Sequence, residues 1–169
     1  MNFKLLISNP SHLLHRDEND TTVSEALQTI YPYTKESSVY MYWNGYILEL
    51  WFCAEISDIF KDILQMVDSL KNKKAISISW GSNIFSSTWD CSYCKQDVKI
   101  KATWTALRGG YETLKQLNMV SNELIIDIDL FLKEWLKLLM QIKEDLKKMG
   151  YRKNNLEDFY LLESLDLFV

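Results

Sequence analysis

The sequence predicts an α+β protein in which a mainly antiparallel sheet of about six or seven strands packs against helices. Two observations support this fold class. Short β-prone runs outnumber the helical segments, and most of these runs are joined by turns too short for a crossover. Two longer segments carry apolar residues at helical spacing. The 169 residues contain no repeat, linker or low-complexity tract, so we expect a single α+β domain over 1–169.

The N-terminal part is expected to form a strand, a loop and a short helix. Apolar residues alternate over 3–7, which predicts a strand that ends at Asn9–Pro10. The polar stretch 12–20 is typical of a loop. Thr22 followed by Glu25 fits a capping box and predicts a helix over 23–30.

The clearest local pattern is a β-hairpin around Asn44–Gly45. Two β-prone runs, 39–43 and 46–52, flank this dipeptide, and both of its residues tolerate the positive φ of a type I′ turn. A two-residue loop pairs Trp43 with Tyr46, Tyr42 with Ile47 and Met41 with Leu48. Both faces of the hairpin then carry large apolar groups, which is typical of a central strand in a covered sheet. The alternative is that only a partner covers one face.

The rest of the chain predicts three helices and further strands. The period of two over 97–107 indicates a strand with one face on the core and the other in water. Asp129 is expected to cap the longest helix, and Gly150 to end it. The expected elements are a helix over 56–70, strands over 76–80, 84–89, 97–107 and 124–128, a short helical segment over 111–117, a helix over 131–149, and an acidic helix in 155–169 with Phe159, Leu162 and Leu165 facing inward.

Two ligand pairs raise the question of zinc. Cys91 and Cys94 form a C-x-x-C pair, and His12 and His15, the only two histidines, form an H-x-x-H pair. Two Cys and two His can bind Zn²⁺ tetrahedrally. The pairs lie far apart in the sequence, however, and a hairpin turn with two thiols plus two surface imidazoles is favoured. A redox C-x-x-C needs a helix N-terminus, whereas this pair lies between predicted strands. We expect neither a metal nor a cofactor.

Catalytic motifs are missing from the sequence. It contains no G-x-S-x-G, P-loop, dinucleotide fingerprint or H-E-x-x-H. Asp127 and Asp129 could in principle form a general acid/base pair, but a strand edge followed by a helix cap is favoured. We therefore expect a protein that is not an enzyme. One alternative is a small enzyme or ligand-binding domain that uses these aspartates or the pair Cys91 and Cys94.

Charge is unevenly distributed along an acidic chain. The net charge is −4, yet basic residues outnumber acidic ones by seven to two between 71 and 108. A second alternative is therefore a nucleic-acid-associated domain that uses Lys95, Lys99, Lys101 and Arg108. Single-strand binders interleave aromatic residues on the basic face, whereas Trp104 falls on the opposite face here. No apolar run has transmembrane length and none matches a signal peptide, so we expect a cytoplasmic protein.

Acidic residues gather in the loop 16–20 and in the tail 155–169, which has no basic residue. Such stretches complement a basic partner, and charge complementarity steers association and discriminates between partners. The six Trp and nine Tyr fit either a large aromatic core, which is the commoner case, or an interface. The residues expected to bind a partner are Asp17, Glu18, Asp20, Glu157, Asp158, Tyr160, Glu163 and Asp166.

Four features resemble the small immunity proteins of bacterial contact-dependent growth-inhibition systems. These are the chain length, the acidic charge, the Tyr/Trp-rich hairpin at Asn44–Gly45 and the acidic aromatic segment 156–160. The likeness is one of general character over the whole chain, so it identifies no contact residues. It implies a cytoplasmic, non-enzymatic protein that binds a cognate toxin domain, such as a nuclease, and blocks its active site. It implies a protein partner rather than a membrane, a nucleic acid or a small molecule.

Overall fold

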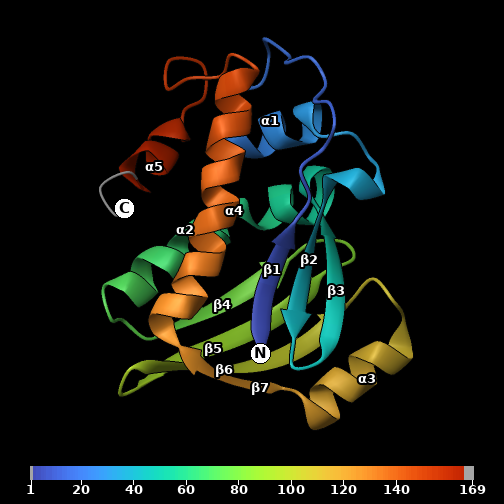
Figure 1. The fold of residues 1–169 in the computed structure, drawn as a ribbon, viewed down its shortest axis with the longest axis vertical. Helices are drawn as coiled ribbons and strands as arrows, with labels where there is room; N and C mark the ends of the chain where they lie inside the picture. Colours follow the sequence, from blue (N-terminus) through green and yellow to red (C-terminus); the bar gives the residue numbers. More distant parts are fainter. Residues whose placement is uncertain (1, 166–169) are drawn as a thin grey trace.

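The computed structural model of this chain describes residues 2–165 and is an α+β fold with antiparallel strands, as predicted (Figure 1). The strands are β1 (Phe3–Ile7), β2 (Ser38–Trp43), β3 (Tyr46–Trp51), β4 (Ile76–Gly81), β5 (Ser86–Cys94), β6 (Asp97–Ala106) and β7 (Glu123–Asp127). The α-helices are α1 (Val23–Ile30), α2 (Ser57–Lys71), α3 (Tyr111–Val120), α4 (Ile128–Lys148) and α5 (Phe159–Glu163). A 3₁₀-helix (Lys35–Ser37) precedes β2, and a π-helix (Phe52–Ile56) leads into α2.

The strands divide between two sheets instead of forming the single sheet that we expected. One sheet has the order β1-β2-β3 and the other β4-β5-β6-β7, with antiparallel neighbours throughout. Between β3 and β4 the chain passes through the π-helix and α2, and this connection carries it into the second layer. The strands of the two sheets cross at a large angle (Figure 1). Periodicity reveals which face of a strand is buried but not which strands share a sheet.

Local signals in the first fifty residues are confirmed. The hairpin has the predicted register, with Trp43 opposite Tyr46, and its turn residues Asn44 and Gly45 have φ values of 45° and 94°. The capping box of α1 is also present, because Thr22 accepts from the backbone of Glu25 while the Glu25 carboxylate accepts from the backbone of Thr22. Each signal depends only on residues that lie within a few positions of one another, so neither depends on the tertiary fold.

The start of α4 differs from the prediction. The helix begins at Ile128, and its N-cap is Asp127, whose Oδ1 accepts the backbone N–H of Leu130 at 3.0 Å. Asp129 lies in the first turn, where a negative charge still favours the positive end of the helix dipole. Both aspartates suit a helix start, and the sequence pattern did not distinguish between them. Among residues 2–165, none of the helices has the length and apolar character that a membrane crossing requires.

The core lies between the two sheets and is rich in tryptophan. Trp43 on β2 packs against Trp89 on β5 and Trp104 on β6, with ring centroids 4.9 and 5.1 Å apart. Five of the six tryptophans are fully buried, so the Trp excess is mainly a core feature, whereas Trp51 keeps an accessible face. The inward-facing tail residues are buried as predicted: Phe159, Leu162 and Leu165.

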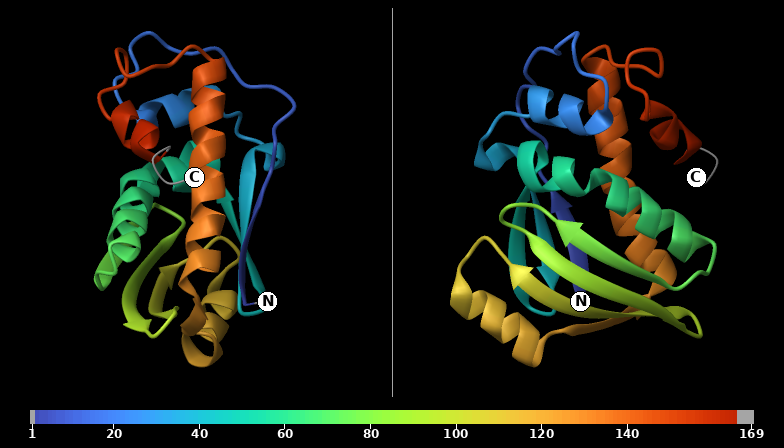
Figure 2. Two further views of the ribbon diagram at one scale, coloured as in Figure 1. Left: turned by 60° about the vertical axis from the view of Figure 1, so that its left-hand side comes forward. Right: turned by 180° about the vertical axis from the view of Figure 1, so that it is seen from behind.

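Helix α4 closes one edge of the first sheet (Figure 2). The backbone N–H of Leu5 donates to Glu134 Oε2 at 3.0 Å, and the side-chain amide of Gln141 donates to the Ser8 carbonyl at 2.8 Å. The first bond gives a partner to a backbone N–H on the outer side of β1, which an edge strand otherwise leaves unpaired, and the second ties α4 to the residue that follows β1. The opposite edge is β3, beside which no further strand lies in the described range 2–165.

Candidate functional site

The outer faces of the two sheets differ in chemistry. On the β4–β7 sheet the outer face is polar, with Ser77 donating to Asp90 at 2.6 Å and Lys99 paired with Glu123 at 3.1 Å. This is the solvated face that the alternation over 97–107 predicted. The outward face of the β1–β3 sheet carries large apolar and aromatic groups, and we call it the aromatic face. Its members are Lys4, Leu6, Tyr40, Tyr42, Ile47, Glu49 and Trp51.

The aromatic face is ordered by the register of its three strands. Tyr42 lies between Lys4 and Ile47 in one row, and Tyr40 lies between Leu6 and Glu49 in the next. Leu6 and Ile47 are exposed, and the two tyrosines are only partly covered. Among residues 2–165 no helix crosses in front of this sheet in Figure 1. The intramolecular cover expected for a hairpin that is apolar on both faces is therefore absent from the described part of the chain.

One end of the aromatic face carries a group of four side chains, which we call the Trp51 cluster: Tyr33, Trp51, Glu55 and Arg108. The Tyr33 and Trp51 ring centroids are 4.0 Å apart, and Arg108 Cζ lies 4.6 Å from the Trp51 ring centroid. Glu55 is fully buried. Its Oε1 accepts from Arg108 at 2.8 Å, and its Oε2 accepts the backbone N–H of Trp51 at 2.8 Å. One buried carboxylate therefore fixes both the strand end and the guanidinium.

The π-helix is the local cause of this arrangement. It begins directly after Trp51, and its wide turn brings the Glu55 carboxylate back to the Trp51 backbone. Short π-helical turns are rare and recur at functional sites. Burial alone would lower the pKa of Arg108, but the hydrogen bond and charge of Glu55 outweigh it and raise that pKa above its ordinary value. Arg108 is therefore a permanent cation over one side of Trp51.

The structure brings the two acidic segments together at one end of the molecule. The backbone N–H of Glu157 donates to the Thr21 carbonyl at 2.9 Å, and the Tyr151 hydroxyl donates to the Asp20 carboxylate. The same hydroxyl accepts the backbone N–H of Asp17 at 3.2 Å. The loop before α1 and the segment before α5 lie side by side in Figures 1 and 2. We call this region the acidic end.

The predicted partner-binding residues have different environments at the acidic end. Glu18, Glu157 and Tyr160 are exposed, and Glu163 is partly covered. Asp158 is buried, and its Oδ1 accepts the backbone N–H of Val23 at 2.7 Å. Asp158 thus gives a hydrogen-bond acceptor to a backbone N–H at the N-terminus of α1, and this bond links the C-terminal segment to α1. Asp166 lies outside the described residues. Partner binding by this set stays a prediction.

Replacing Asp158 by alanine is expected to lower the free energy of unfolding by about 1.5–3 kcal/mol, because a charge-assisted hydrogen bond to a buried N–H is lost. The matched control is Glu157→Ala at the adjacent exposed position, with an expected change within about 0.5 kcal/mol. Urea denaturation measures both. Equal changes in the two variants would contradict the structural role of Asp158.

The cysteine pair lies in a strand and not in the turn that we expected. β5 continues through Cys94, so Cys91 faces the core while Cys94 is exposed. Positions three apart on a strand lie on opposite faces, which prevents the two thiols from binding one ion. Residues 2–165 contain no group of three or more His, Cys, Asp or Glu side chains that could hold a metal.

The two thiols are expected to react at different rates. Burial, with a further contribution from Asp90, raises the pKa of Cys91 to about 12, so little thiolate forms at neutral pH. In the native protein Cys94 should therefore be alkylated by iodoacetamide about tenfold faster than Cys91 or more. Mass spectrometry of labelled peptides measures both rates, and the difference should disappear in urea. Equal native rates would mean that Cys91 is not held in the core.

The basic residues of the nucleic-acid alternative do not form one free patch. Lys99 is paired with Glu123, and Arg108 is paired with the buried Glu55. Lys95 lies in the turn after β5, and Lys101 is exposed on the polar outer face of the second sheet. Of these four cations, Arg108 contacts aromatic side chains: it lies over the Trp51 ring and hydrogen bonds with Tyr33.

Comparisons with protein-family models, curated proteins and solved structures found no match.

Sequence reasoning missed the Trp51 cluster because its members come from three separate segments. In the sequence Arg108 stands out only by its charge, and Tyr33 and Glu55 belong to no motif. The one signal that pointed to this region was the hairpin with large apolar groups on both faces, together with the alternative that a partner covers one of them.

Proposed function

We propose that this chain is a protein-binding domain that acts as an immunity protein. It binds a cognate toxin domain through the aromatic face and the Trp51 cluster, and it neutralises the toxin by covering its active site. The observation that carries this proposal is a sheet face with exposed aliphatic and partly exposed aromatic side chains, while the outer face of the second sheet has an ordinary polar composition.

The composition of the aromatic face suits a protein partner. Trp, Tyr and Arg are the residues that most often dominate binding energy in protein interfaces, and the Trp51 cluster contains one of each. Contiguous exposed apolar surface on a soluble protein commonly marks an interaction site. The buried Glu55 holds Arg108 and Trp51 in place before binding, which reduces the side-chain entropy lost on association.

The choice of a toxin as the partner rests on charge and on the resemblance described above. A nuclease domain presents a basic phosphate-binding cleft, and the net charge of −4 on this chain favours association with such a surface. The exposed acids at the acidic end, Glu18 and Glu157, add to this attraction. A protein that acts by covering an active site needs no catalytic residues of its own.

Two exposed isoleucines give a matched test. Ile47 on the aromatic face is 64% exposed, and Ile125 on the outer face of the second sheet is 54% exposed. The probe is the C-terminal domain of the protein encoded directly upstream, co-expressed with this chain. Ile47→Asp should weaken binding about tenfold or more and reduce protection of growth, because it buries a charge in the interface. Ile125→Asp should change neither.

Two results would contradict the proposal. If the wild-type chain forms no complex with that domain and gives no protection, the toxin assignment is wrong. If it does bind but Ile47→Asp and Ile125→Asp have equal effects, the aromatic face is not the binding surface.

A further inference from the structure

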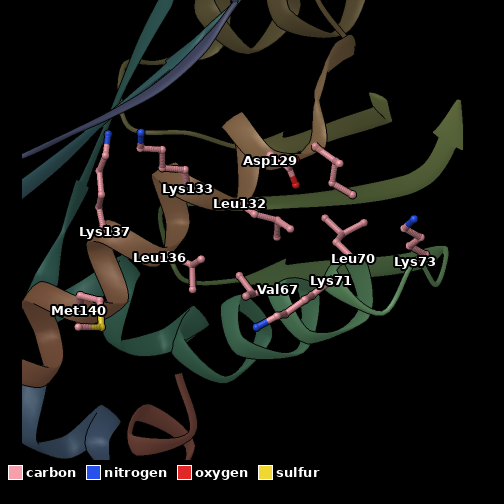
Figure 3. Close-up of a pocket in the computed structure, with 11 residues that line it drawn as sticks. Val67, Leu70, Lys71, Lys73, Asp129, Leu132, Lys133, Leu136, Lys137 and Met140 are labelled. Atoms are coloured by element: carbon pink, nitrogen blue, oxygen red, sulfur yellow. The ribbon is translucent and has the colours of Figure 1, made fainter. Parts of the chain in front are cut away.

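A concave site lies between α2 and α4, on surfaces that the proposed function does not use (Figure 3). Its volume is about 620 Å³. We call it the α2–α4 groove. In Figure 3 the side chains of Val67 and Leu70 from α2 point toward those of Leu132 and Leu136 from α4. These side chains, with Met140, form an apolar floor.

The groove exists because α4 has two apolar stripes. One stripe, which includes Trp135 and Leu139, is fully buried in the core. The other consists of Leu132, Leu136 and Met140, spaced four residues apart on one side of the helix and only partly covered. Eight residues of helix span about 12 Å, so this second stripe forms an elongated apolar track. Within residues 2–165, this track keeps a partly open side.

Lysines border the apolar floor. Lys71, Lys73, Lys133 and Lys137 all line the groove, against a single acid, Asp129. Lys137 is also paired with Glu134 on its own helix at 2.5 Å. Lys73 lies at one end of the groove, while Lys133 and Lys137 extend from α4 away from the floor (Figure 3). The positive charges of Lys73, Lys133 and Lys137 are therefore placed around the apolar surface, whereas the amino group of Lys71 is buried.

We propose that the α2–α4 groove binds a single-chain amphiphile with an anionic head group, of the fatty-acid class. The alkyl chain lies along Leu132, Leu136 and Met140, and the head group is held at the lysine border. Small-molecule sites have volumes of roughly 300–1,000 Å³ and are mainly apolar with a few polar groups that set orientation, and the groove fits both criteria. The excess of lysines over acids selects a negative head group.

Calorimetry with dodecanoate, used below its micelle concentration, tests the proposal on the full chain. We expect saturable binding with one molecule per chain. Dodecyltrimethylammonium has the same alkyl chain with a positive head group, and it should bind at least about tenfold more weakly because it meets the lysines. Absence of saturable dodecanoate binding would overturn the proposal, and so would equal affinity for the two amphiphiles.

Two substitutions on the same helix locate the site. Leu136→Glu places a charge on the groove floor and should weaken dodecanoate binding about tenfold or more. Leu130→Glu is the matched control, since Leu130 is 58% exposed on α4 and does not line the groove, and its affinity should be unchanged. Circular dichroism melting checks that both variants are folded. Equal affinities in both variants would overturn the assignment.

A surface variant keeps the test decisive if Leu136→Glu fails to fold. The double variant Lys73→Glu, Lys133→Glu alters only exposed positions and should reverse the preference, weakening dodecanoate and strengthening the ammonium amphiphile. An unchanged preference would overturn the proposal. If instead Leu136→Glu abolishes binding of the toxin domain while dodecanoate does not bind the wild-type chain, the groove is a protein-docking site and the amphiphile proposal is wrong.

Discussion

Replacing Trp43 by alanine is expected to lower the free energy of unfolding by about 3–5 kcal/mol. Trp43 is fully buried and connects the two sheets through its contacts with Trp89 and Trp104. The loss of its ring leaves a cavity between the layers that neither sheet can fill by a local shift. Its Nε1 also donates to the Ser121 carbonyl at 2.7 Å, and the variant leaves that acceptor without its side-chain partner, which adds to the cost.

Urea denaturation followed by circular dichroism measures this change. Trp43→Phe should be less destabilising because it keeps an aromatic ring between the sheets. Tyr111→Ala, at an exposed position on α3, should change the free energy of unfolding by less than about 0.5 kcal/mol. A loss below about 1 kcal/mol for Trp43→Ala would mean that the sheets do not pack through this residue.

Replacing Arg108 by alanine is expected to cost about 3 kcal/mol of unfolding free energy, because it leaves the carboxylate of Glu55 buried without its cation. This expected loss of unfolding free energy is at the low end of the range for a broken buried ion pair, since the guanidinium of Arg108 is itself partly exposed. The variant also removes the cation that lies over Trp51.

A double-mutant cycle separates the buried charge from lost packing. Glu55→Gln in the Arg108→Ala background removes the uncompensated charge and keeps an oxygen that can accept the Trp51 backbone N–H. It should recover about 1 kcal/mol or more relative to Arg108→Ala alone. A coupling energy below about 0.5 kcal/mol between the two positions would show that the pair is not a buried, interacting unit.

The sequence predicted local structure where the signal lies within a few residues. The capping box of α1 needs only Thr22 and Glu25, and the hairpin register follows from the two residues of its turn. The division into two sheets depends on contacts such as Trp43 with Trp89, which are distant in sequence and which periodicity does not encode. Either arrangement of the strands satisfies the same inward and outward pattern.

The candidate site was less predictable than the fold. Counting charges found the two acidic segments that the structure brings together, but it did not distinguish Asp158, which supports α1, from the exposed Glu157. The Trp51 cluster combines residues from the α1–β2 connection, from the end of β3 with the adjoining π-helix, and from the β6–α3 connection. Side chains that meet only through tertiary structure leave no mark in the spacing of residues along the chain.

Side-chain footprinting with hydroxyl radicals tests most directly whether the aromatic face is the binding surface. Three tyrosines of similar exposure report on three surfaces: Tyr33 in the Trp51 cluster at the end of the aromatic face (65%), Tyr160 at the acidic end (60%) and Tyr111 on α3 (72%). In complex with the toxin domain, oxidation of Tyr33 and Trp51 should fall several-fold, and oxidation of Tyr111 should not change. If Tyr33 and Trp51 are oxidised as fast in the complex as in the free chain, whether or not Tyr160 is protected, the partner does not bind the aromatic face.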